Sequence, residues 1–124
     1  MGIFSFRKDK NKVIDFSDEN IAELKIKSDL LGKILIENGK GVYLEHLSRI
    51  LNEAENKNEA VFRRLVISRE LFGGSGALWE IYIEDFTEYH KFNKQFSEYI
   101  GLLTHMGIKN GRVKQIQKRM CKLK

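Results

Sequence analysis

The sequence contains no proline, only one cysteine and no long run of apolar residues. Without proline, only glycine and clusters of Asn and Asp break the chain sharply, which favours long helices over a fold with many turns. The single Cys121 cannot form an internal disulfide, so a reducing compartment is the simplest setting. No stretch is long enough to span a bilayer, and residues 1–7 lack the pattern of a signal peptide. We therefore expect a cytoplasmic protein that does not associate with membranes.

The remaining composition is sufficient for one folded domain with charged ends. The chain has 124 residues, 42% of them hydrophobic, which is the size of one ordinary domain with a core. Residues 1–12 hold four basic residues against one acid, and residues 109–124 hold seven basic residues and no acid. Because the whole chain has a net charge of +5, residues 13–108 carry a net charge of −5. The sequence predicts an acidic body with basic ends.

Apolar residues recur at helical spacing along most of the chain. Ser17 fits an N-cap, and Asn38 followed by Gly39 is a typical helix end. Within this first helix, Ser28 and Gly32 are small enough to let a neighbouring helix approach closely. The same periodicity predicts four further helices, at about 42–55, 58–72, 77–106 and 110–124.

We therefore expect an all-α fold, a compact bundle of about five helices over residues 17–124, with a basic amphipathic helix at the C-terminus. Residues 1–16 are expected to form an N-terminal arm. The extent of the fourth helix stays open, because Thr87 fits the cap of a second helix within 77–106. Residues 81–83, Ile-Tyr-Ile, also suit a strand, but no partner strand of similar quality exists, and isolated strands are not stable.

The glycine-rich stretch at residues 73–76 resembles parts of a dinucleotide-binding motif and of a nucleophile elbow, but the residues that should surround these motifs are missing. Gly74-Ser75-Gly76 begins a dinucleotide fingerprint, but the third glycine would fall at Trp79 and no strand precedes it. A nucleophile elbow around Ser75 also requires a preceding strand and a histidine aimed at the serine. We interpret this stretch as a structural turn between two helices, in which glycine adopts conformations that a Cβ would penalise. The turn residues are Gly73, Gly74, Ser75 and Gly76.

Acidic residues follow this turn at helical spacing. Glu80, Glu84 and Glu88 are four residues apart, so on a continuous helix they would line one face, with Asp85 beside them. A run of this kind is commonly a solvated face, and the functional alternative is a surface for a basic partner. Trp79 at its edge suits an interface anchor. The candidate partner-binding residues are Trp79, Glu80, Glu84, Asp85 and Glu88.

The sequence bears on two other kinds of site, a metal site and a nucleic-acid-binding surface. His46, His90, His105 and Cys121 are scattered and match no metal-ligand spacing, so no metal or cofactor is expected. The basic C-terminal helix is a candidate for binding nucleic acid through phosphate contacts, which would be salt-dependent and independent of base sequence. Its candidate residues are Arg112, Lys114, Lys118, Arg119 and Lys122.

The run LFGGSGALWEIYIED resembles a motif of small bacterial helical domains, written loosely as Leu-Phe-Gly-Gly-x-Gly-Ser/Ala. The matching residues are Leu71, Phe72, Gly73, Gly74, Gly76 and Ala77. At Trp79-Glu80 the chain departs from the usual Asn-Asp, so no role of that pair is carried over. The resemblance covers about an eighth of the chain and implies no catalytic residue. Such domains are similar to immunity proteins of polymorphic toxin systems, which implies a binding role.

Together these observations favour a non-enzymatic protein-binding module, in which an acidic helix face occludes a basic surface such as the active-site region of a toxin domain. The alternative is a nucleic-acid accessory protein that acts through the basic C-terminal helix. No side chains at suitable spacing support an enzyme. The sequence leaves the oligomeric state open.

Overall fold

The computed structural model describes residues 13–68, 71 and 76–123, and for residues 112 and 120–123 it describes the backbone alone. These residues form helices and turns and contain no β-strand. The expected all-α helical bundle is confirmed. Its α-helices are α2 (Asp18–Glu37), α3 (Leu44–Glu55), α4 (Glu59–Val66), α6 (Phe86–Met106) and α7 (Gly111–Leu123), and its 3₁₀ turns are η1 (Gly41–Tyr43) and η2 (Leu78–Glu80).

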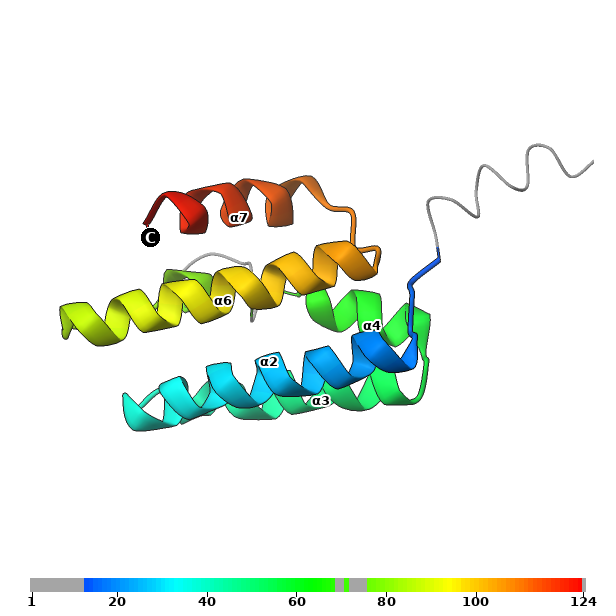
Figure 1. Ribbon diagram of the computed structural model, residues 1–124, viewed down its shortest axis with the longest axis horizontal. Coiled ribbons are helices and arrows are strands. Elements are labelled where there is room, and N and C mark those ends of the chain that lie inside the picture. Colours follow the sequence, from blue (N-terminus) through cyan, green and yellow to red (C-terminus); the bar gives the residue numbers. More distant parts are fainter. Residues whose placement is uncertain (1–12, 69–70, 72–75, 124) are drawn as a thin grey trace, which may run out of the picture.

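Helix α6 is the centre of the bundle. It packs against α2 on one side and α7 on the other, while α3 packs on α2 and α4 on α3. The four longer helices run roughly along one axis, and α6 is antiparallel to both of its neighbours (Figure 1). The core between α2 and α6 is fully buried and includes Leu24, Leu31, Leu35, Phe92, Phe96 and Leu103.

Helix α2 begins and ends as its sequence predicts. The Oγ atom of Ser17 accepts a hydrogen bond from the N–H of Asn20 at 3.2 Å, which satisfies one free donor of the first turn. At the other end Gly39 adopts a φ of +72°, in the left-handed region. Gly32 allows the expected close approach, because a Cβ there would lie only 2.9 Å from Cδ2 of Leu44.

The described end of the expected N-terminal arm lies on the helical body. Ile14 is buried, and its N–H donates to Oε1 of Glu59 at 3.3 Å. The N–H of Asp15 donates to the carbonyl of Met106 at 2.8 Å. The ring of Phe16 makes an edge contact with Phe62, with 5.2 Å between centroids. Residues 13–16 are therefore tied to α4 and to the end of α6. Residues 1–12 lie outside the described part.

The third helix is shorter than its periodicity indicates. Helix α4 ends at Val66, so the prediction of a helix from 58 through 72 is wrong for residues 67 and 68, which form a turn and a bend. The physical reason is a contact from α3. Nε2 of the buried His46 lies 2.8 Å from the carbonyl oxygen of Leu65 and 2.9 Å from Oγ of Ser68. A side chain distant in sequence thus binds the polar groups at the end of α4.

The predicted helix over 77–106 is wrong for residues 77–85. After η2, residues 81–83 are extended without strand pairing, and residues 84–85 form a bend. Helix α6 begins at Phe86, and its N-cap is Asp85, whose Oδ1 accepts the N–H of Glu88 at 2.9 Å. The cap suggested at Thr87 is therefore wrong. A carboxylate at this position satisfies a free N–H and suits the positive end of the helix dipole.

Candidate functional site

The predicted structural turn is described at one residue. Gly76 has a φ of +90°, a conformation that L-residues rarely adopt, and its carbonyl accepts a hydrogen bond from the hydroxyl of Tyr43 at 2.8 Å. Gly73, Gly74 and Ser75 lie outside the described residues. Ala77, the N-cap of η2, is extended and makes no side-chain cap bond.

Trp79 anchors the connection rather than standing free at its surface. Its neighbour Leu78 is fully buried, and Trp79 itself is partly buried against the same core. From the other side, the guanidinium of Arg119 in α7 lies 5.3 Å from the centroid of the Trp79 ring. A cation at this distance over an aromatic face is attracted by the ring quadrupole. Trp79 therefore joins the connection to α7.

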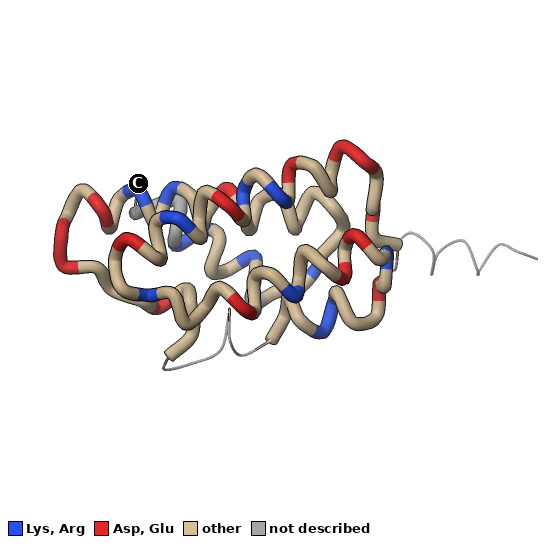
Figure 2. Tube along the Cα trace, turned by 90° about the horizontal axis from the view of Figure 1, so that it is seen from below, with Lys and Arg blue, Asp and Glu red and all other residues tan. Residues whose placement is uncertain are grey.

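The four predicted acidic residues do not share a helix face. Glu80 ends the 3₁₀ turn η2, Glu84 and Asp85 lie in the bend, and only Glu88 belongs to α6. The expected i, i+4, i+8 stripe is wrong because residues 77–85 are not α-helical. Three of the carboxylates, those of Glu80, Glu84 and Asp85, are nevertheless exposed. They are presented by a loop that leads into α6, and acidic positions are visible at that end of the bundle in Figure 2.

Glu88 has a structural task within the bundle. Its Oε1 accepts a hydrogen bond from Nδ2 of Asn38 at 3.0 Å, and its Oε2 pairs with Nζ of Lys91 at 3.0 Å. The hydrogen bond from Asn38 and then that from Lys91 lower the pKa of Glu88 below its ordinary value. Because Asn38 ends α2, Glu88 links the end of α2 to the first turn of α6, and its carboxylate is committed to these contacts.

Two exposed aromatic residues, Tyr82 and Phe86, were not among the predicted site residues. Tyr82 is 64% exposed and Phe86 is 74% exposed. The ring of Tyr82 contacts Tyr89 at 5.3 Å, and that of Phe86 meets the edge of His90 at 4.4 Å between centroids. The signal that could have found them is the alternation of residues 81–84. Ile83 is buried while its neighbours Tyr82 and Glu84 are exposed, as expected of an extended segment with one buried side.

We refer to residues 80–86 as the acidic-aromatic segment. Its inward side chains, Ile81 and Ile83, pack on the core and hold it in place. Its outward side chains combine three carboxylates and two aromatic rings, those of Glu80, Tyr82, Glu84, Asp85 and Phe86.

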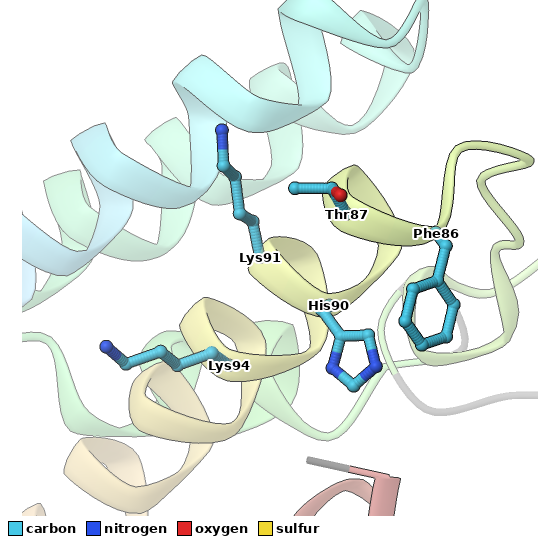
Figure 3. A pocket seen from close by; sticks show the side chains of 5 residues that line it. All are labelled: Phe86, Thr87, His90, Lys91 and Lys94. Atoms are coloured by element: carbon cyan, nitrogen blue, oxygen red, sulfur yellow. The ribbon is translucent and has the colours of Figure 1, made fainter.

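An open groove of about 410 Å³ lies on the first half of α6 and begins at Phe86, the last residue of this segment. Its described lining consists of Phe86, Thr87, His90, Lys91 and Lys94. Figure 3 shows the rings of Phe86 and His90 on one side of α6, with Thr87 and Lys91 on the side toward α2. The groove thus combines two aromatic rings with two lysine side chains along the first half of α6.

The candidate nucleic-acid residues lie on an amphipathic helix, as expected. Asn110 caps α7, since its Oδ1 accepts the N–H of Val113 at 3.2 Å. Val113 and Ile116 are buried, whereas Lys114, Lys118 and Arg119 are exposed. The side chains of Arg112 and Lys122 lie outside the described part. Arg119 differs from the two lysines because it is engaged with Trp79.

Among the described residues, no three His, Cys, Asp or Glu side chains converge as metal ligands would. The side chain of Cys121 lies outside this part. No described helix has an apolar stretch long enough to cross a membrane. Comparison of the chain with family models, with curated proteins and with solved structures finds no match.

Proposed function

We propose that this protein is a non-enzymatic protein-binding module and that its acidic-aromatic segment recognises a basic, partly apolar surface on the partner. The observation that carries the proposal is the exposure of Tyr82 and Phe86 on either side of Glu84 and Asp85. Large aromatic side chains are enriched among the residues that dominate binding energy. Carboxylates beside them would steer a basic partner and select its orientation.

The anchoring of the segment supports this role. Ile83 and Leu78 are buried, and Asp85 is fixed by its cap bond to Glu88, so the exposed rings are held at defined positions. A preorganised loop loses less conformational entropy when a partner binds than a free one does. Resemblance to immunity-type domains favours a toxin domain as the partner, with its basic active-site region occluded by the acidic-aromatic segment.

Site-specific photo-crosslinking tests the proposal before the partner is identified. A photoreactive residue placed at position 82 or 86 should capture one protein from cells, while the same residue at position 13 should not. Val13 is a matched control because it is 62% exposed, close to the 64% of Tyr82, and the bond from Asp15 to Met106 places it at the other end of α6. Equal capture at all three positions would show that the segment is not a specific interface.

Affinity measurements with the purified partner then separate the aromatic from the charged contribution. Tyr82→Ala or Phe86→Ala should weaken binding by about tenfold or more, as expected for residues central to an interface. Glu84→Lys should weaken binding and flatten its salt dependence, because it reverses an exposed charge. Val13→Ala and Glu55→Lys, at exposed positions outside the segment, should change neither. If the segment variants bind as tightly as the controls, the proposal is wrong.

Nucleic-acid binding through α7 is the second candidate function, favoured by the exposure of Lys114 and Lys118 on a helix whose first turn holds no acid. Truncation before residue 109 would uncover the core, since Val113 and Ile116 are buried. Lys114→Glu with Lys118→Glu is the cleaner test. In a gel-shift titration with single- and double-stranded probes, this pair should weaken binding and reduce its salt dependence. The absence of binding by the unaltered chain would exclude this function.

A further inference from the structure

The two lysines of the α6 groove are in different electrostatic states. Nζ of Lys91 pairs with Oε2 of Glu88 at 3.0 Å, and this hydrogen bond, followed by the charges of Glu88, Glu37 and Asp85, raises the pKa of Lys91. Lys91 therefore stays protonated, and its charge is partly compensated by Glu88 of the same helix. Lys94, one turn further along α6, is exposed and makes no ion pair with a described residue. It is the groove's available cation.

The opposite wall of the groove combines aromatic surface with a hydrogen-bonding ring. Phe86 is 74% exposed, and its ring meets the edge of His90, with 4.4 Å between centroids. The ring nitrogens of His90 make no hydrogen bond to a described residue. Because Phe86, His90 and Lys94 are spaced four residues apart on α6, they follow one row along the helix. Figure 3 shows the two rings side by side, with the Lys94 side chain to the left of them on the next turn of the helix.

We propose that this groove is a binding site for a small organic anion that carries a flat ring. The ring would lie against Phe86 and His90, and the anionic group would reach the ammonium of Lys94 and a ring N–H of His90. A volume of about 410 Å³ suits this class of ligand, since small-molecule sites typically span about 300–1,000 Å³. The groove shares Phe86 with the acidic-aromatic segment, but it can be tested with small probes in the absence of any protein partner.

Two acids lie near the groove, and both make contacts within the chain. One oxygen of Asp85 accepts the N–H of Glu88 at 2.9 Å. The carboxylate of Glu88 is held by Asn38 and Lys91. No acidic residue is among the described residues that line the groove.

Three probes test whether ring and anion act together. Phenyl phosphate combines both groups, inorganic phosphate carries the anion alone, and benzyl alcohol carries the ring alone. In NMR titrations of the full chain, phenyl phosphate should shift the signals of Phe86, His90 and Lys94 in a saturable way and bind more tightly than either fragment. If inorganic phosphate binds as tightly as phenyl phosphate, or if no probe saturates, the proposal is overturned.

Matched lysine variants locate the anionic group. Lys94→Ala should weaken phenyl phosphate binding by up to about fivefold, the upper end expected for an exposed ion pair. Lys91→Ala should change it less, because Lys91 is already paired with Glu88. Lys94→Gln repeats the test with a longer side chain, should Lys94→Ala fail to fold as judged by circular dichroism. Equal effects of the substitutions at 91 and 94 would contradict the assignment.

Discussion

The guanidinium of Arg119 lies 5.3 Å from the centre of the Trp79 ring, and this contact joins α7 to the connection that precedes α6. Trp79 belongs to the acidic candidate surface and Arg119 to the basic one. The two surfaces that the sequence presents as alternatives are therefore neighbours in the folded chain. Arg119 is partly engaged in this contact. Lys114 and Lys118 are exposed on the described part of α7 and make no contact of this kind.

Arg119→Ala should loosen the attachment of α7. We expect a loss of about 0.5–1 kcal/mol in the free energy of unfolding, the usual value of an exposed cation–π contact. Trp79 is the only tryptophan, so its fluorescence reports directly on this site. Without the guanidinium over its face, the ring should be more hydrated and its emission should shift to longer wavelength. Urea titration followed by fluorescence measures both effects.

Lys118→Ala is the control for Arg119→Ala. Both side chains are exposed on α7, but only Arg119 lies over the indole. Lys118→Ala should leave the emission and the free energy of unfolding nearly unchanged. If the two substitutions shift the emission equally, the contact between Arg119 and Trp79 does not hold α7 in place.

Gly107 is required where α6 ends and residues 13–15 cross it. It adopts a φ of +126°, and a Cβ there would lie 2.8 Å from the carbonyl oxygen of Val13. Gly107→Ala should therefore destabilise the fold by about 1–3 kcal/mol through backbone strain, with the clash against backbone adding to it. Chemical denaturation of the purified variant measures the loss.

Gly39→Ala separates the cost of backbone strain from the cost of the clash. Gly39 also has a positive φ, +72°, but a Cβ there would meet no atom within 4 Å. Its substitution should cost about 1 kcal/mol, the penalty of the left-handed conformation alone. A loss at Gly107 no greater than the loss at Gly39 would show that the segment at Val13 moves aside freely.

Local signals in the sequence predict much of the fold. The caps at Ser17 and Asn110 and the helix end at Asn38 depend on groups within a few residues of one another, so the sequence alone is sufficient to identify them. The early end of α4 depends on His46, 19 residues from Leu65 along the chain. A contact of that kind leaves no local pattern. The position of residues 13–16 on the bundle likewise depends on contacts with Met106 and Glu59, which are distant in sequence.

The sequence singles out Trp79 and the acidic residues of the candidate site, but not its two exposed rings or its geometry. Helical periodicity favours a helix across residues 77–85, and Tyr82 and Phe86 fit that spacing. In the structure Tyr82 and Phe86 are exposed, so the stripe does not form one buried face. Tertiary packing of Leu78 and Ile83 overrides the spacing and extends the chain. Glu84 points outward because it follows the buried Ile83 on an extended stretch.

The contact between Glu88 and Asn38 makes stability depend on pH. The pKa of Glu88 is lowered from its ordinary value of 4.5, chiefly by Asn38 and then by Lys91. A lowered folded-state pKa stabilises the fold above the ordinary pKa, and this contribution is lost as pH falls through the folded value. Asn38→Ala should return the pKa of Glu88 toward 4.5 and remove this part of the acid sensitivity. Carboxyl NMR titration measures the pKa.

Lys91→Met provides the comparison for Asn38→Ala. It removes both the hydrogen bond and the positive charge that Lys91 supplies, so the pKa of Glu88 should rise in this variant as well. Thermal unfolding at several pH values below 5 should show a reduced acid sensitivity in both variants. If Lys91→Met leaves the pKa of Glu88 unchanged, the amide of Asn38 alone determines its acidity.

Asp85 has a structural role as the N-cap of α6 and a proposed role in binding, and two substitutions separate these roles. Asp85→Ala should destabilise the protein by about 1 kcal/mol, since Oδ1 of Asp85 accepts the N–H of Glu88 at 2.9 Å. Asp85→Asn keeps an oxygen that can cap and should preserve most of the stability while it removes the charge. A weaker affinity of Asp85→Asn for a basic partner would then reflect charge alone. Thr87→Ala should change the free energy of unfolding little. If it destabilises the protein more than Asp85→Ala does, Thr87 and not Asp85 is the N-cap of α6.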